Sequence, residues 1–226
     1  MSEQVKIRTV CIDTLTGIQN EIYMTDSKKP GYDEWTDYGK GIWRLISSLQ
    51  DKGFEIVLVL GEPGTGKSTG MRTLPPNTNI WFNADNKNPV WVGGKAEYGT
   101  KLNPRMPYHL IPKKYSEIIN HIDEVEKRIG FEEQKFAILT AHIEDYKSGV
   151  YQKRRLKTLG KVATNMQLEG RLETVLYAEV EKNGNENRYV LTTQNDGTNT
   201  ARSPMDLFES VIDNDYNFVI DKLLEY

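Results

Sequence analysis

The sequence predicts an α/β fold with a mostly parallel central sheet. Apolar runs of strand length recur along the chain, at 5–12, 54–60, 79–83 and 136–140. Between them lie segments with apolar residues at helical spacing, at 33–52 and 115–129. Alternating strands and helices imply parallel strands covered on both faces. At 226 residues, the chain is long enough to form one such domain with a sizeable core.

The first strand, 5–12, ends at Asp13. Residues 16–33 contain Lys-Lys-Pro-Gly and are expected to form a loop. The helix over 33–52 follows, and Gly53 is suited to end it. Its apolar positions recur every three or four residues, at Trp35, Tyr38, Ile42, Leu45, Ile46 and Leu49. We expect its aromatic residues, with Trp43, to pack in the core.

Strand 54–60 leads into a glycine-rich loop, after which 69–74 predicts one or two helical turns before two prolines. The short strand 79–83 ends near Asp85. Residues 86–112 are rich in Gly, Pro, Asn and Lys without a clear period, so we expect a long functional loop. Helix 115–129 stops at Gly130, and strand 136–140 follows it.

The last third of the chain has a different pattern. It opens with a basic run at 153–161. Two apolar stretches, 173–180 and 188–193, flank Asn183-Gly-Asn-Glu-Asn187 and predict a β-hairpin that adds antiparallel strands at the sheet edge. We therefore expect a single domain over 1–226, with a parallel core at 5–140 and an extension at 141–226.

Composition limits the compartment and the partners. The formal net charge is −3, so the whole chain carries no basic signal for nucleic acid, although a local patch is compatible with it. Cys11 is the only cysteine, which suits a reducing cytosol. No apolar run approaches the roughly 20 residues that span a bilayer, and the first residues lack the apolar stretch of a signal peptide. We expect a cytoplasmic protein without a membrane partner, in the host cytoplasm if a phage encodes it.

Residues 61–68 carry the strongest motif, a complete G-x-x-x-x-G-K-[ST] phosphate-binding loop between a strand and a helix start. Glycines let backbone amides curl around phosphate oxygens, and a helix N-terminus adds free donors. Lys67 is suited to neutralise the β- and γ-phosphates, and Ser68 to offer its hydroxyl to Mg²⁺. The residues expected to bind nucleotide are Gly61, Glu62, Pro63, Gly64, Thr65, Gly66, Lys67, Ser68 and Thr69.

Hydrolysis also needs a metal-organising carboxylate and a group that orients water. Asp13 ends an apolar strand, where ligands of open α/β sheets bind, and we expect it to hold Mg²⁺ opposite Ser68. A turn-capping role is the alternative. Thr14 follows Asp13, so the adjacent glutamate of many AAA-class ATPases is absent. Asp85 is the expected base, with an Asx turn as its alternative.

Weaker alternatives for the base are Glu144 and Asp145. His142 follows strand 136–140 and is suited to sense the γ-phosphate, although a lone histidine is more often structural. Arg154 and Arg155 are suited to serve as an arginine finger toward a neighbouring subunit or to contact DNA phosphates. The alternative is that both are solvated surface charges.

Several pieces of the sequence together resemble small phage RecA-like ATPases of the Sak type, which are nucleotide-binding proteins linked to single-strand annealing and recombination. Beyond the phosphate loop, the resembling pieces are Ile-Asp-Thr-Leu-Thr-Gly at 12–17, Asn-Ala-Asp-Asn-Lys at 83–87, Ala-His-Ile-Glu-Asp-Tyr-Lys at 141–147, and Thr-Gln-Asn-Asp-Gly with Ala-Arg-Ser-Pro at 193–204. The resemblance implies a RecA-like P-loop NTPase fold, ATP with Mg²⁺, action on single-stranded DNA, and a homo-oligomeric ring or filament.

The order of these pieces departs from the family, in which the phosphate loop precedes the metal-binding aspartate. Here Asp13 precedes Gly61. The order of these pieces in the family is restored when the segments are read in the order 135–140, 61–134, 5–60 and 141–226. We therefore hypothesise a rewired chain, natural or engineered, in which strands 54–60 and 135–140 have exchanged places. In a RecA-like sheet these two positions are adjacent, parallel and central.

Three functions follow as expectations. The first is a Mg²⁺-dependent ATPase that acts on single-stranded DNA in phage recombination. The second is a small-molecule P-loop kinase, with 86–112 or 147–161 as its lid. The third is a rewired nucleotide-binding scaffold with little turnover, because catalytic groups tolerate a misplacement of only about half an ångström.

Overall fold

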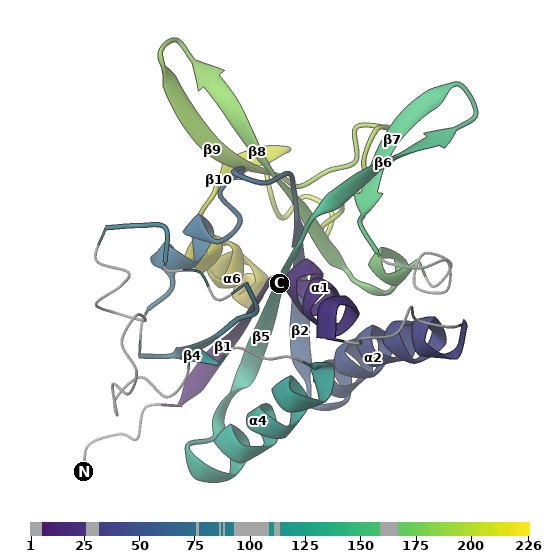
Figure 1. Ribbon diagram of the computed structural model, residues 1–226. Helices are drawn as coiled ribbons and strands as arrows, with labels where there is room; N and C mark the ends of the chain where they lie inside the picture. Colours follow the sequence, from purple (N-terminus) through teal and green to yellow (C-terminus); the bar gives the residue numbers. More distant parts are fainter. Residues whose placement is uncertain are drawn as a thin grey trace.

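The computed structural model describes residues 6–25, 32–75, 77–85, 87, 89–92, 109–110, 114–158 and 167–226 (Figure 1). The elements in chain order are β1 (Ile7–Asp13), α1 (Leu15–Thr25), α2 (Tyr32–Asp51), β2 (Phe54–Leu60), the 3₁₀ helix η1 (Thr69–Thr73), β3 (Asn79–Asn83), β4 (His109–Leu110), α4 (Tyr115–Arg128), β5 (Phe131–Ala141), β6 (Ile143–Ser148), β7 (Tyr151–Leu156), the 3₁₀ helix η2 (Leu168–Arg171), β8 (Thr174–Asn183), β9 (Glu186–Thr192), β10 (Val211–Asp213) and α6 (Tyr216–Glu225).

Eight of the strands form one sheet in the order β10-β9-β8-β2-β5-β1-β3-β4. From β8 to β4 every neighbouring pair is parallel, whereas β9 and β10 run antiparallel to their neighbours. The predicted α/β class with a mostly parallel sheet and a C-terminal antiparallel hairpin is confirmed. One detail was wrong. The first hairpin strand, β8, pairs parallel with β2, so the parallel part of the sheet extends beyond residue 140.

The centre of the sheet is the pair β2 and β5, which run parallel from Phe54 opposite Lys135 to Leu60 opposite Ala141. On the other side of β5, β1 is also parallel, with Cys11 opposite Ile138. The two strands that the rewiring hypothesis exchanges are therefore adjacent, parallel and central. Since parallel strands end at one sheet edge, β1 delivers Asp13 to the edge where β2 enters the phosphate loop.

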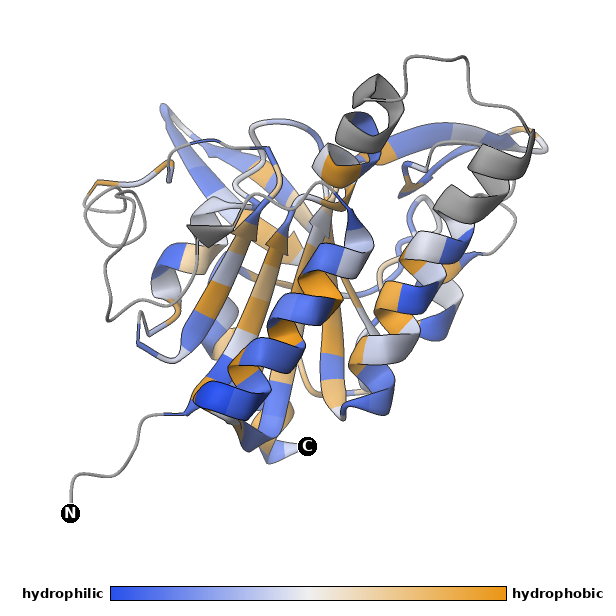
Figure 2. Cartoon of the chain, turned by 60° about the horizontal axis from the view of Figure 1, so that its bottom comes forward, coloured by the Kyte–Doolittle hydropathy of each residue, from blue (hydrophilic) through white to orange (hydrophobic). Residues whose placement is uncertain are grey.

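Side chains alternate between the two faces of the sheet, and each face is covered. On β2, Ile56 and Leu58 pack into a core with α1, α2 and α4, while Val57 and Val59 pack into a second core with η1 and α6. Figure 1 shows α1, α2 and α4 on one side of the strands and α6 behind them. Figure 2 shows apolar residues along the strands and polar residues on the outward sides of the helices.

The two helices predicted around the first core are confirmed with nearly the expected bounds. Gly53 and Gly130, which follow α2 and α4, have positive φ angles of 77° and 87°, as helix-ending glycines commonly do. Side chains at 32–38, including Trp35 and Tyr38, lie outside the described residues. The prediction that Trp43 is a core residue was wrong, because its side chain is 40% exposed and stacks beneath the Arg171 guanidinium at 3.6 Å.

Three further expectations differ from the structure. Residues 16–25, expected as loop, belong to α1, whose Leu15 and Ile18 are fully buried in the first core. The strand expected at 136–140 begins earlier, at Phe131, whose ring packs edge-on against Phe54 at 5.1 Å. Of the long loop expected over 86–112, only residues 87, 89–92 and the short strand β4 lie in the described part.

Two β-hairpins project from the carboxyl edge of the sheet as diverging arms (Figure 1). The arm β8–β9 turns at Gly184 and matches the predicted hairpin. The arm β6–β7, which the sequence did not predict, turns at Gly149 and carries the first three basic residues of the run, 153–155, on β7. Across the described ranges, no helix combines the length and the apolar character that a bilayer crossing requires.

Candidate functional site

The predicted phosphate-binding loop, Gly61–Thr69, connects β2 to η1 at the carboxyl edge of the sheet. Gly64 and Gly66 have φ angles of +83° and +86°, a left-handed conformation that favours glycine. Gly66 also lacks room for a side chain, since a Cβ there would lie 2.8 Å from both Tyr189 and Asn214. Both glycines are therefore required by the shape of the loop.

Several backbone amides of this loop are unsatisfied by the protein. Those of Gly64, Gly66, Lys67, Ser68 and Thr69 donate to no acceptor among the residues that the structure describes. Successive amides of this kind form an anion-binding concavity. The helix after the loop is only a five-residue 3₁₀ helix, so the amides rather than a long helix dipole supply most of the attraction.

Lys67 is folded back onto its own loop. Its Nζ donates to the carbonyl oxygens of Gly61 at 2.8 Å and Glu62 at 2.7 Å. Burial lowers the pKa of Lys67 to about 8, and the carboxylates of Asp13 and two other acidic residues oppose that shift only in part. A buried, incompletely neutralised ammonium has an unmet attraction for an anion.

Asp13 lies beside the loop, as predicted. The residue is 4% exposed, and its carboxylate accepts hydrogen bonds from the hydroxyls of Thr140, at 2.6 Å, and Ser68. Burial raises the pKa of Asp13, although both hydrogen bonds act in the opposite direction. Ser68 and Asp13 therefore form a hydroxyl–carboxylate pair next to Lys67, where a hard cation would gain oxygen ligands.

One cavity of about 500 Å³ brings together the loop and three of the more distant predicted residues. It is lined by Asp13, Asp85 and His142, together with loop residues and Lys87. Asp85 is held by an ion pair with Lys87 at 2.7 Å, and its carboxylate lies against Gly17, where a Cβ would come within 2.2 Å of Oδ1.

His142 lies beside Lys67, with Nδ1 3.5 Å from Nζ. Its backbone amide donates to the Thr16 hydroxyl at 3.0 Å. Burial, and then the charge of Lys67, lowers the pKa of His142, so the imidazole is neutral at pH 7. A neutral ring at this position can accept or donate one hydrogen bond toward a ligand on the loop.

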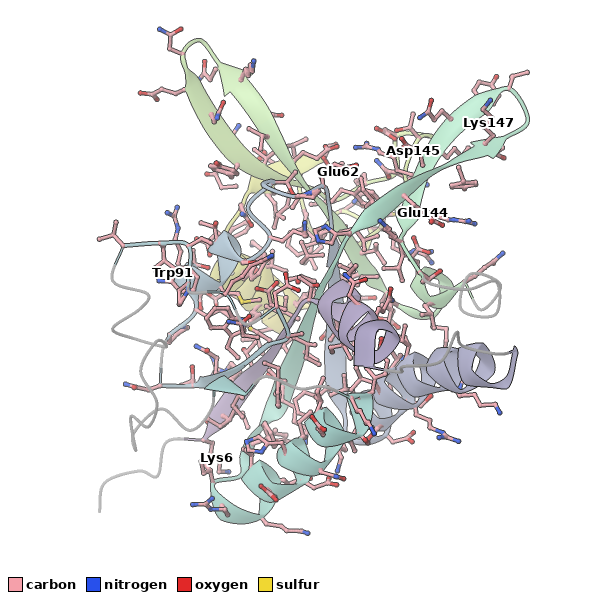
Figure 3. All side chains as sticks on the ribbon, in the orientation of Figure 1. Lys6, Glu62, Trp91, Glu144, Asp145 and Lys147 are labelled. Carbon is pink, nitrogen blue, oxygen red and sulfur yellow. The ribbon has the colours of Figure 1, made fainter. Side chains whose placement is uncertain are left out.

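The remaining predicted residues lie on the arms and do not line this cavity. Arg154 pairs with Glu179 at 2.6 Å, and Arg155 pairs with Glu144 at 2.9 Å. Figure 3 shows Glu62 where the two arms meet, while Glu144 and Asp145 lie out along β6. Neither Glu144 nor Asp145 lines the cavity that contains the loop, so the structure favours Asp85 over these two alternatives on position alone. Arg154 and Arg155 are occupied by partners in their own chain.

Sequence reasoning missed the residues that support the loop from behind. Tyr216 donates its hydroxyl hydrogen to the Lys67 carbonyl, and the Asn214 side chain donates to the Gly66 carbonyl at 2.7 Å. These contacts join residues about 150 positions apart, so no local pattern could reveal them. It also missed Thr140, the last residue but one of β5, and Lys87, four residues after the end of β3, although polar residues near strand ends are the signal that revealed Asp13 and Asp85.

A second cavity of about 710 Å³ adjoins the first and shares Thr69, Val90 and Tyr189 with it. Arg72 and Trp91 also line this cavity. Trp91, labelled in Figure 3, packs on Trp81 with ring centroids 6.0 Å apart. A ligand anchored on the loop would therefore find aromatic surfaces within reach.

No cluster of three or more His, Cys, Asp or Glu side chains suited to a metal occurs in the described part of the chain. A magnesium ion that shares its coordination with substrate phosphates needs only one or two protein ligands, so the Asp13–Ser68 pair is chemically sufficient.

The sequence matches no protein-family model and none of the curated proteins compared with it.

Proposed function

We propose that this protein is a Mg²⁺-dependent P-loop NTPase that binds and hydrolyses ATP. One observation carries the proposal. The loop amides that lack protein acceptors surround the same cavity as buried Lys67 and the Asp13–Ser68 pair. Cationic, amide-rich concavities favour phosphate, and a carboxylate with a hydroxyl favours Mg²⁺. The choice of ATP over other triphosphates rests on the family resemblance.

Each residue has a role in this proposal. The loop amides hold the phosphates, and Lys67 leaves the carbonyl groups of Gly61 and Glu62 to bind phosphate oxygens. Asp85 orients the attacking water and accepts its proton. His142 senses the γ-phosphate as a neutral hydrogen-bonding group. The adjoining cavity, with Trp91 and Tyr189, accommodates the nucleoside.

Asp13 and Ser68 are the residues that would hold Mg²⁺, which supplies charge neutralisation at the phosphates when bound. The fit rests on this chain's own chemistry, because Asp13 is buried next to Ser68 and its pKa is raised above the ordinary range. Thr140 fixes the carboxylate by donating to Oδ1 at 2.6 Å. A cation at this position would compensate a charge that burial otherwise disfavours.

The RecA-like assignment is also part of the proposal. It is supported by the strand order β8-β2-β5-β1-β3, which puts the loop-bearing strand beside β5 and the aspartate strand one position further. On this basis the connectivity is rewired relative to the resembled family. Action on single-stranded DNA, assembly into a homo-oligomer and a cytoplasmic location follow from the resemblance.

The test uses two variants with opposite expectations. Lys67→Met should abolish ATP binding measured by isothermal titration calorimetry with Mg²⁺. Asp85→Asn should retain binding but lose phosphate release by about 10²-fold or more, as expected when a group that handles the proton is removed. Unchanged turnover in Asp85→Asn would reject Asp85 as the base.

The same assays separate the alternatives. Transfer of phosphate to an added small molecule, rather than release of free phosphate, would identify a kinase. Nucleotide binding that raises the melting temperature without turnover would identify a non-hydrolysing scaffold. Absence of ATP binding by the unmodified protein would refute the proposed function itself.

A further inference from the structure

Two lysines line the phosphate-loop cavity. Lys67 belongs to the motif, whereas Lys87 comes from the turn after β3 and has no role in the proposal so far. Among the described residues that line this cavity, they are the only lysines or arginines. Among the described residues, the additional positive charge on the wall of this cavity is therefore that of Lys87, since Arg72 lines the adjoining cavity instead.

The backbone of Lys87 is fixed while its side chain is exposed. The buried side chain of Asn83 makes two hydrogen bonds to the Lys87 backbone. Its Nδ2 donates to the Lys87 carbonyl, and its Oδ1 accepts from the Lys87 amide at 3.3 Å. The Lys87 side chain is 72% exposed. A flexible four-carbon stem on a fixed anchor lets the ammonium change partners without moving the chain.

In this structure the partner of Lys87 is Asp85, at 2.7 Å. Asp85 is confined, because its carboxylate lies against Gly17 and its side chain is 21% exposed. An ion pair with one largely exposed member contributes little to stability. The pair is therefore easily exchanged, and Lys87 is the member able to move.

The arginines considered from sequence are engaged elsewhere. Arg154 and Arg155 form ion pairs with Glu179 and Glu144 on the arms. Phosphoryl transfer nevertheless requires positive charge at the γ-phosphate, supplied either by the same chain or by a neighbour. Lys87 can supply this charge from the same chain, because it already lines the cavity.

We propose that Lys87 is the same-chain cation of this site and that it leaves Asp85 for the γ-phosphate when the triphosphate binds. The inference rests on the proposed function. The exchange also releases the Asp85 carboxylate to act as base. Water then attacks the γ-phosphorus and forms a new P–O bond. The bond to the β,γ-bridging oxygen breaks, its electron pair stays on ADP, and the proton of the attacking water passes to Asp85.

The experiment compares Lys87→Met with the matched control Lys127→Met, an exposed α4 lysine that does not line the cavity. Calorimetry measures the affinities for Mg·ATP and Mg·ADP, and phosphate release measures kcat. Lys87→Met should leave ADP affinity unchanged, weaken ATP binding about 10-fold, and lower kcat by about 10²-fold, the scale for losing one charge-stabilising donor. Lys87→Arg should restore most of the ATP preference, and Lys127→Met should match the unmodified protein.

Repeating the Lys87 substitution in an Asp85→Asn variant distinguishes two roles for Lys87. One is direct contact with the phosphate, and the other is only to position Asp85. In Asp85→Asn, the further change Lys87→Met should still reduce the preference for ATP over ADP, since the phosphate contact does not depend on the carboxylate. An unchanged ATP-to-ADP affinity ratio in Lys87→Met, or loss of its effect in the Asp85→Asn background, would overturn the inference and leave the proposed function standing. Failure of the unmodified protein to bind either nucleotide would overturn both.

Discussion

Lys67 illustrates a conflict between stability and function at a single residue. Its ammonium is buried, and burial lowers its pKa to about 8. Below pH 8 the folded protein therefore holds a positive charge that burial disfavours. The two carbonyl contacts compensate for only part of the lost hydration. A phosphate group would compensate for more of it. The residue is thus better suited to the bound state than to the free protein.

A pH-dependent stability difference follows from that lowered pKa. An unfolded lysine titrates near 10.5, so the folded protein loses this proton first, and the Lys67 contribution to stability rises between pH 8 and 10.5. Lys67→Met has no such titration. Its stability relative to the unmodified protein should therefore be greater at pH 7 than at pH 9.5, by about 2 kcal/mol. Urea unfolding of both proteins at both pH values measures the difference in their free energies of unfolding. If that difference were the same at pH 7 and pH 9.5, burial would not destabilise the charged form of Lys67.

The segment from β10 into α6 acts as a support for the phosphate loop. Tyr216 is 1% exposed and reaches the Lys67 carbonyl, while Asn214 reaches the Gly66 carbonyl. Gly70 in η1 allows this packing, since a Cβ there would lie 2.5 Å from the Tyr216 ring. These contacts fix the backbone whose amides face the cavity.

Removing that support should affect binding more than folding. Tyr216→Phe deletes one hydrogen bond, which typically contributes about 1 kcal/mol to stability. The displaced loop should weaken nucleotide binding several-fold and raise KM with little change in kcat. Asn217→Ala is the matched control, because that side chain bonds Asp221 on the helix surface instead. A lowered kcat with unchanged KM in Tyr216→Phe would contradict a supporting role.

Elements with a well-defined buried apolar surface were predictable, and the polar arm β6–β7 and helix α1 were not. The apolar stripes of α2 and α4 gave clear periods, and β2, which is buried on both faces, gave a continuous apolar run. The arm β6–β7 is polar on both faces, as in Glu144-Asp-Tyr-Lys147, so it has no alternation to detect. Helix α1 was missed because glycine and asparagine weaken its pattern, while packing of Leu15 and Ile18 stabilises it in the fold.

At the scale of the whole molecule, the site is assembled from segments far apart in sequence. The loop was predictable because its motif is contiguous. Asp13, Asp85 and His142 were predictable because strand ends meet at one edge of a parallel sheet. The partner of each side chain was not predictable from sequence. Asp13 with Thr140 joins positions 127 residues apart, and that pairing depends on β1 lying next to β5.

Binding to single-stranded DNA is the prediction at this scale. The chain is acidic overall, so contact must come from local basic residues such as Lys147 and Lys153 on the β6–β7 arm. For two to four phosphate contacts with a single strand, log affinity should fall with log salt at a slope of about −1.4 to −2.8. Fluorescence anisotropy over a salt series measures it. Changing Lys147 and Lys153 together to Glu should flatten the slope, whereas Lys127→Glu should not. A slope near zero in the unmodified protein would exclude phosphate contacts.

The contact between Tyr216 and the Lys67 carbonyl has a consequence for how the protein is made. Synthesis proceeds from the amino end, and 149 positions separate these two residues. A nascent chain that has just completed its glycine-rich motif therefore lacks the side chains that support the loop. These arrive only when the segment from β10 into α6 has been made and docks. Capture on immobilised nucleotide would then separate chains that include the segment from β10 into α6 from ribosomal truncation products that end before Asn214.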